Sequence, residues 1–300
     1  MFFVCHGYFS HTKCEYQLNY LNQNHQCITC RVLHKLQIIK NTIKFNMSKA
    51  LVSLVTGAAS GLGKATVERL VKDGYKVIMC DLPSSEGKSV AETFGPNTNF
   101  VPTDVRSETD VQNAIDTCSQ LHGKLNLIVN CAGISVARKV FNFNKSSAHS
   151  LEEFTDVLMV NTVGSFNVIR LGAALMGKNE TDENGQRGVV INTSGYSAYD
   201  GQTGQVAFAA SKGAIAAMTL PLARDMASQG IRHCSIAPGL FDTPLLNHLP
   251  EKVKNYFADM TPFPKRLGQP EEFANLVVSI VNNPFLNGEV IRIDGGIRLI

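Results

Sequence analysis

The stretch Leu51–Gly74, "LVSLVTGAASGLGKATVERLVKDG", decides the fold. It opens with a short apolar, β-branched run, continues with three glycines within seven positions, and ends in an amphipathic segment. Short apolar runs rich in β-branched residues are typical of buried strands, and longer amphipathic segments are typical of helices. The stretch therefore predicts a strand, a tight glycine turn and a helix in immediate succession.

The same alternation continues along the chain. Further short apolar runs lie at 76–80, 99–103, 125–130, 188–193, 231–237 and 289–293. Strands that alternate with helices form parallel βαβ units. We therefore predict an α/β fold, a doubly wound Rossmann-type parallel sheet of seven strands with helices on both faces. Ligands of such sheets bind beyond the carboxyl ends of the strands.

The glycine turn after the first predicted strand is a candidate phosphate site. Gly57, Gly61 and Gly63 tolerate unusual backbone angles and let backbone amides approach a pyrophosphate. Ser60 and Leu62 complete the turn. The N-terminus of the following helix adds unpaired N–H groups and the positive end of its dipole. A glycine-rich turn alone is weak support, but its place between a strand and a helix favours a dinucleotide site.

Acidic and small residues at the next strand ends extend this site. Asp81 ends the second predicted strand, where a carboxylate can accept both hydroxyls of an adenosine ribose and repel a 2′-phosphate. This favours NAD over NADP, while a helix cap or turn residue is the alternative interpretation of Asp81. The third and fourth strand ends supply further candidates, which are Asp104, Val105, Asn130 and Cys131.

Composition separates residues 1–46 from the rest. They hold five Lys/Arg against one acidic residue, and four of the eight cysteines. We predict a basic N-terminal extension at 1–46 and one globular domain at 47–300. The basic, acid-free segment 31–45 suits an organelle-targeting presequence, and an upstream extension that depends on start-codon choice is the alternative.

Charge and cysteine patterns exclude other classes of protein. Residues 47–300 carry 23 basic and 24 acidic residues, which predicts no nucleic-acid binding. No apolar run of 18 residues free of charges occurs, so we expect no membrane partner. Cys27 and Cys30, near His25 and His34, lack a second ligand pair at suitable spacing, so we predict no metal site.

Five motifs of the chain have the spacing of one known family. They are Thr-Gly-x-x-x-Gly-x-Gly at 56–63, Asn-x-Ala-Gly at 130–133, Asn161, Pro238-Gly239 and Asp294-Gly295-Gly296. Together they resemble the short-chain dehydrogenase/reductase superfamily. Within it, "NCAGI", "IAPGLFDTPLL" and "PFLNGEVIRIDG" are similar to the 3-hydroxyacyl-CoA dehydrogenases of type 2, also called 17β-hydroxysteroid dehydrogenases of type 10.

The resemblance implies an NAD-dependent, homotetrameric oxidoreductase that acts on acyl-CoA or steroid-like substrates. It implies a mitochondrial location, with the cytoplasm as the alternative. It also implies a scaffold role for a tRNA methyltransferase in mitochondrial tRNA processing. The cofactor contacts that it implies are Ser60, Leu62, Asp81, Asp104, Val105, Cys131, Lys212, Phe241 and Thr243.

The catalytic positions depart from the family pattern. The family Asn and Lys correspond to Asn161 and Lys212, both retained. The family Ser position is occupied by Gly195 and the family Tyr position by Phe208. In the family the phenol acts as general acid or base, and the nearby ammonium lowers its pKa. Phe208 keeps the ring without the oxygen that carries the proton.

A displaced hydroxyl could rescue the site. None of the seven tyrosines has a Lys four positions later, so the Tyr-x-x-x-Lys motif has not moved along the chain. A bulge could bring Ser194 or Tyr196 to the place of the missing hydroxyls, and ordinary loop polarity is the alternative interpretation. We expect activity by the family mechanism to be weak or lost, with a catalytically silent NAD-binding scaffold as the alternative function.

Overall fold

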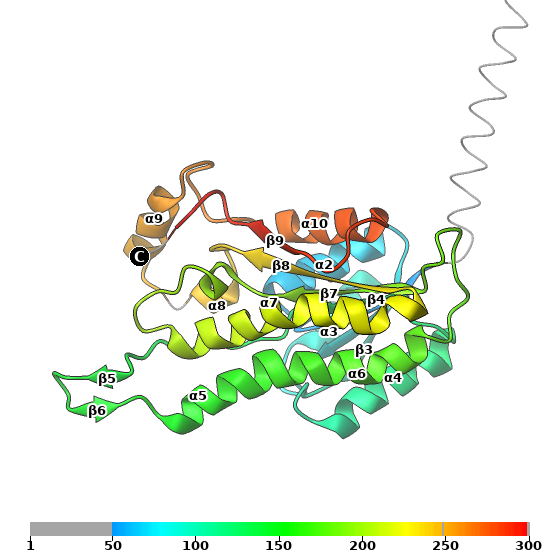
Figure 1. Cartoon of the computed structure of the whole chain (residues 1–300), viewed down its shortest axis with the longest axis horizontal. Coiled ribbons are helices and arrows are strands. Elements are labelled where there is room, and N and C mark those ends of the chain that lie inside the picture. The colour runs from blue at the N-terminus through cyan, green and yellow to red at the C-terminus, as the bar shows by residue number, and fades with distance from the viewer. Residues whose placement is uncertain (1–49, 248, 299–300) are drawn as a thin grey trace, which may run out of the picture. The chain divides into compact units, whose positions relative to one another are not determined.

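A parallel sheet of seven strands forms the centre of the computed structural model, which describes residues 50–247 and 249–298 (Figure 1). The strand order is β3–β2–β1–β4–β7–β8–β9, so the order reverses between β1 and β4. The strands are β1 (Val52–Thr56), β2 (Lys76–Asp81), β3 (Thr98–Pro102), β4 (Leu127–Asn130), β7 (Gly188–Thr193), β8 (Ile231–Pro238) and β9 (Val290–Ile293). The predicted parallel fold is confirmed.

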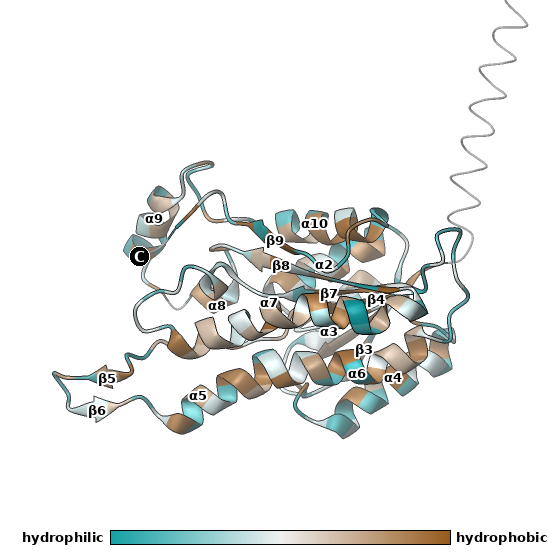
Figure 2. Cartoon of the chain, in the orientation of Figure 1, coloured by the Kyte–Doolittle hydropathy of each residue, from teal (hydrophilic) through white to brown (hydrophobic). Residues whose placement is uncertain are grey.

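Helices cover both faces of the sheet, as predicted. On one face α4 (Glu108–His122), α6 (Ser165–Met176) and α7 (Val206–Met226) share an apolar core with the strands. On the other face the core is shared by α2 (Gly61–Lys72), α3 (Gly87–Phe94) and α10 (Pro270–Asn282). Because both faces are covered, strands such as β1, β4 and β8 are buried along their whole length. Figure 2 shows the helices presenting hydrophobic and hydrophilic residues on different sides.

Two neighbouring helices form one long rod with a local change of winding. α5 (Leu151–Leu158) leads directly into a π-helical turn, Met159–Gly164, and then into α6. Turns of this kind occur frequently at functional sites. The π turn contains Asn161, one of the predicted site residues.

A small hairpin was not predicted. β5 (Phe141–Asn142) and β6 (Ser147–Ala148) pair antiparallel and extend away from the sheet (Figure 1). Strands of two residues are too short to show the alternation on which strand prediction depends. Two more helices, α8 (Pro244–Asn247) and α9 (Glu251–Met260), follow β8 within the segment 239–263.

Two helical stretches, Leu151–Met176 and Val206–Gln229, are long and apolar enough to cross a membrane by length and composition alone. Of the 18-residue apolar segment in each stretch, 44% and 39%, respectively, is buried inside the molecule. Both contribute to the core beside the sheet, for example through Ile169 and Leu222. Core helices of soluble proteins share these features, so the two stretches are weak support for a membrane span.

The predicted extension 1–46, the targeting interpretation of 31–45 and the Cys27 and Cys30 pair lie outside the described residues. No cluster of three or more potential metal ligands occurs in the part of the chain that the structure describes.

Candidate functional site

Two adjoining cavities lie at the carboxyl ends of the central strands. The first has a volume of about 370 Å³ and is lined by the glycine turn and the ends of β2 and β3. The second, of about 280 Å³, is lined by the end of β7, the start of α7 and the segment after β8. Leu62, Cys131, Gly133, Thr243 and Leu245 line both. The two cavities therefore form the halves of one site.

Most of the predicted cofactor residues line the first cavity. They are Gly57, Ser60, Gly61, Leu62, Gly63, Asp81, Asp104, Val105, Cys131 and Thr243. The predicted residues Lys212 and Phe241 line the second cavity instead. Asn130 lines neither, because its side-chain amide is buried and donates to the Oδ1 of Asn192, 2.9 Å away.

The glycine turn has no room for side chains at two positions. Gly57 has φ +62°, and a Cβ there would lie 2.8 Å from the amide nitrogen of Ala132. A Cβ on Gly63 would lie 2.1 Å from the carbonyl oxygen of Gly57. The first turn of α2 therefore packs directly against the backbone of Gly57, and Gly57 packs against the backbone of the loop after β4. This cradle fits a pyrophosphate, which backbone amides can approach closely.

Asp81 is held at the edge of the first cavity. Its carboxylate accepts hydrogen bonds from the backbone N–H groups of Ala59 and Leu82, both at 2.8 Å. The side chain thus joins the end of β2 to the glycine turn. Each carboxylate oxygen can accept more than one hydrogen bond, so the group can still receive ribose hydroxyls.

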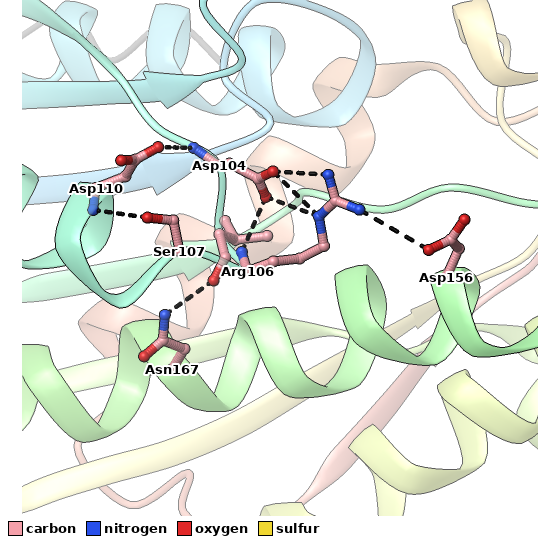
Figure 3. Close-up of polar contacts among 7 residues, drawn as sticks. Asp104, Arg106, Ser107, Asp110, Asp156 and Asn167 are labelled. Atoms are coloured by element: carbon pink, nitrogen blue, oxygen red, sulfur yellow. Dashed lines mark hydrogen bonds and ion pairs between the residues drawn. The ribbon is translucent and has the colours of Figure 1, made fainter. Parts of the chain in front are cut away.

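A charged cluster forms the far wall of the first cavity (Figure 3). The guanidinium of Arg106 donates to both carboxylate oxygens of Asp104, at 2.7 to 3.1 Å, and lies 3.9 Å from the carboxylate of Asp156 in α5. The hydrogen bonds from Arg106 lower the pKa of Asp104. Arg106 was not among the predicted site residues, because the strand-end candidates were acidic and small residues. Of the described residues that line this cavity, Arg106 is the one with a basic side chain.

Asn161 ties the two halves of the site together. From the π turn its Oδ1 accepts from the backbone N–H of Ile134, 2.8 Å away. Its Nδ2 donates to the carbonyl of Ile134 and to the Oγ of Ser211 in α7, both at 2.9 Å. This fixes the loop after β4 against the helix that carries Lys212.

Lys212 is a buried cation beside an aromatic ring. Its Nζ donates to the carbonyl of Thr193 at 2.8 Å and lies 5.4 Å from the centre of the Phe208 ring. Burial lowers the pKa of Lys212 to about 8. The structure therefore brings Lys212 and Phe208 together one helical turn apart, as the spacing predicted.

Gly195 does not need to be glycine for steric reasons. Its backbone is extended, with φ −179°. A Cβ there would lie 3.4 Å from the Cγ of Lys212 and 3.5 Å from the Oγ of Ser197, which are ordinary contact distances. A Cβ would therefore fit at this position, so the backbone does not require glycine here.

The two hydroxyls considered as substitutes are engaged elsewhere. The Oγ of Ser194 donates to the carbonyl of Lys212, 2.8 Å away. The phenol of Tyr196 bonds to the Oε1 of Gln202 at 2.6 Å, and burial raises its pKa to about 12. Tyr196 lines the second cavity as a neutral phenol already paired with an amide.

The remaining wall of the second cavity is apolar. It comes from the segment 239–263, which follows β8. Its members are Leu240, Phe241, Leu245, Leu246, Leu249, Val253 and Phe257. An apolar wall beside a few polar groups is typical of small-molecule sites.

A model of the short chain dehydrogenase family matches residues 51–254. The chain therefore belongs to the short-chain dehydrogenase family, as its motifs predicted, and this class of oxidoreductase agrees with the fold and the position of the site.

Within the family, the chain is similar to proteins named 3-hydroxyacyl-CoA dehydrogenase type-2. The Drosophila melanogaster protein is 59% identical over 253 residues, which are 84% of this chain and 99% of that protein. The Homo sapiens protein is 56% identical over 251 residues, 84% of this chain and 96% of that protein. A crystal structure of the Mycobacterium avium enzyme of that name has a TM-score of 0.80 and 39% identity, covering 84% of this chain and 97% of that one. The predicted resemblance is confirmed.

Proposed function

We propose that this protein binds NAD(H) and acts as a short-chain oxidoreductase whose turnover of 3-hydroxyacyl-CoA or hydroxysteroid substrates is weak or lost. The observation that carries the proposal is a cavity lined by the glycine turn and Asp81 beside a second cavity lined by Gly195 and Phe208. Gly195 and Phe208 stand where the family has Ser and Tyr.

The residues of the first cavity, together with Lys212 from the second, would hold the cofactor. The cradle of Gly57 and Gly63 would receive the pyrophosphate, Asp81 the adenosine ribose, and Lys212 the nicotinamide ribose. When bound, the nicotinamide supplies or accepts a hydride. The apolar wall from segment 239–263 would cover an acyl or steroid substrate.

Proton transfer is the step for which this chain lacks the residue. Phe208 has no oxygen to give a proton to a substrate carbonyl. Losing a positioned acid or base typically slows a reaction by about 10²–10⁴-fold, which is roughly 3–5 kcal/mol of transition-state stabilisation. The absence of the orienting hydroxyl at position 195 should slow the reaction further, but by less than its loss alone would. The reason is that the effects of residues that act as a unit are not additive.

The test compares the parent chain with Gly195→Ser/Phe208→Tyr at saturating NADH. We expect the parent to bind NADH, measured by fluorescence titration, and to oxidise it very slowly with acetoacetyl-CoA. The double variant should gain about 10²–10⁴-fold in kcat because both hydroxyls return to a site that has room for them. Gly195→Ser/Phe208→Leu is the matched control and should gain nothing. A parent turnover near 10 s⁻¹, the median for enzymes, would contradict the proposal.

A second candidate function is a catalytically silent scaffold. The retained cofactor cavity favours it, because a ligand that binds the folded state stabilises it whether or not chemistry follows. We propose a homo-oligomer, a tRNA methyltransferase partner and a mitochondrial location as its context, with the cytoplasm as the alternative. If the double variant gains nothing while the parent copurifies with a tRNA methyltransferase, this candidate is preferred.

A further inference from the structure

The hydroxyl groups that line the second cavity all donate their protons within the protein. The described side chains there that carry a hydroxyl are Ser135, Thr193, Ser194, Tyr196 and Thr243. Their acceptors are, in the same order, the Oε1 of Gln205, the Sγ of Cys131, the carbonyl of Lys212, the Oε1 of Gln202 and the carbonyl of Phe241. A hydroxyl has one proton to donate, so these groups have no donor left for a ligand.

Two amide groups of the same cavity are in the opposite state. Gln202 and Gln205 both line it, and the Oε1 of each accepts a hydroxyl, from Tyr196 at 2.6 Å and from Ser135 at 3.2 Å. Burial raises the pKa of Tyr196 to about 12, so the phenol keeps its proton and donates it. These bonds engage the oxygen of each amide and leave its Nε2, which carries two N–H donors.

The two amide nitrogens are unpaired and accessible. Neither Nε2 has a hydrogen-bond partner among the described residues, and neither is one of the buried unpaired atoms. Both glutamines are half-buried side chains on the cavity wall. Lys212 also keeps N–H groups beyond the one that bonds to Thr193, but the proposed function assigns them to the nicotinamide ribose.

The amides also lie next to the two positions that lack a hydroxyl. Gln205 is the N-terminal cap residue of α7, three positions before Phe208, and both line the cavity. Gln202 is bonded to Tyr196, which directly follows Gly195 in the chain. Donors are therefore present in the part of the cavity where the family hydroxyls are missing.

We propose that Gln202 and Gln205 bind the keto oxygen of a 3-ketoacyl thioester through their Nε2 N–H groups, in place of the hydroxyls that positions 195 and 208 lack. An amide N–H donates a hydrogen bond to a carbonyl oxygen and keeps its proton. The contact thus holds the ketone without supplying the acid that Phe208 lacks. The inference rests on the proposed function, since it assigns ligand-binding residues to that same site.

The test measures binding instead of turnover. NAD⁺ is kept at saturation, because a ketone cannot be reduced by the oxidised cofactor. Acetoacetyl-CoA and butyryl-CoA have acyl chains of the same length and differ only in the 3-keto oxygen. We expect the parent chain to bind acetoacetyl-CoA about tenfold more tightly than butyryl-CoA in isothermal titration calorimetry, which is the usual effect of one or two hydrogen bonds.

The variants Gln202→Glu and Gln205→Glu keep the oxygen that accepts the hydroxyl and replace the NH₂ group by an oxygen that cannot donate. Each should abolish the preference for acetoacetyl-CoA and leave the dissociation constant of NADH, measured by fluorescence titration, close to that of the parent. The ratio of the two thioester dissociation constants cancels any general repulsion of CoA by the added charge. The matched control is Gln120→Glu on the exposed side of α4, which lines neither cavity and should keep the preference.

Three outcomes would overturn the inference and leave the proposed function standing, provided that the parent binds NADH. They are a parent that does not prefer acetoacetyl-CoA, a preference that survives in both glutamate variants, and a preference that is lost equally in Gln120→Glu. A parent that binds no NADH would overturn the proposed function, and the inference with it.

Discussion

At the scale of the residue, the site depends on how a few polar groups are paired. Asp104 and Asp156 share one arginine, Arg106, and Ser194 and Tyr196 are bonded within the fold. Lys212 is different, because it is a cation held in the interior beside an aromatic ring with a single carbonyl as acceptor. A buried ammonium that has no carboxylate partner destabilises the folded state unless it loses its proton.

The pH dependence of the free energy of unfolding should reveal the cost of burying the charged side chain of Lys212. Burial lowers the pKa of Lys212 to about 8 from its ordinary value of 10.5. Between these values the unfolded chain binds more protons than the folded one, so stability rises with pH through that window. Below about pH 8 both states are protonated and the full penalty, on the order of 3 kcal/mol, remains.

We therefore expect Lys212→Met to be more stable than the parent below about pH 8, with the difference shrinking between pH 8 and 10.5. Urea unfolding of both chains at a series of pH values measures it. The difference between the two chains is the useful quantity, because buried cysteines and tyrosines also titrate above pH 9 in both. A difference that stays constant with pH would show that Lys212 carries no burial penalty.

At the scale of the element, close backbone packing in the strand–turn–helix unit of β1 and α2 restricts which residues its positions can hold. The Oγ1 of Thr56 accepts from the backbone N–H groups of Cys131 and Ala132, both at 3.2 Å, so the ends of β1 and β4 are joined. Gly63 packs its Cα directly on the carbonyl of Gly57. The glycines of the cradle, Gly57 and Gly63, are therefore needed for α2 to pack against β1, in addition to the phosphate binding that we propose for them.

Gly63→Ala should weaken both stability and cofactor binding. A Cβ at 2.1 Å from a backbone oxygen forces α2 away from β1, at about 1–3 kcal/mol, and opens the cradle. Urea unfolding and NADH titration measure the two effects, and we expect the NADH dissociation constant to rise at least tenfold. The matched control is Gly213→Ala in α7, where no atom lies within 4 Å of the Cβ position. That variant should be about 1 kcal/mol more stable, through helix propensity alone.

At the scale of the whole molecule, the reversal of strand order between β1 and β4 places both cavities at one edge of the sheet. A dinucleotide that spans both would contact β1, β2, β3, β4 and β7 together and so stabilise the entire fold. The effect of a ligand on melting is set by its concentration relative to its dissociation constant.

We expect NADH to raise the melting temperature and NADPH to raise it far less, because Asp81 would repel a 2′-phosphate. At 100 times the dissociation constant the gain is about 2.7 kcal/mol, or roughly 5 °C or more for a domain of this size. Differential scanning fluorimetry with matched concentrations of the two nucleotides measures it. An equal shift with NADPH would refute the preference assigned to Asp81.

The sequence by itself determined the strand–helix alternation, the glycine turn and the identities of Gly195 and Phe208, since these depend on local periodicity and on residue spacing within one chain. It could not predict the pairing of Arg106 with Asp104 and Asp156, the π turn at Asn161, or the β5–β6 hairpin. Whether a hydroxyl is engaged depends on atoms far away in sequence, so Ser194, Tyr196 and Ser197 look alike until the chain is folded. Only the tertiary structure decided which of the three is hydrogen-bonded and which is buried without a partner, because burial and hydrogen-bond partners are set by packing between elements.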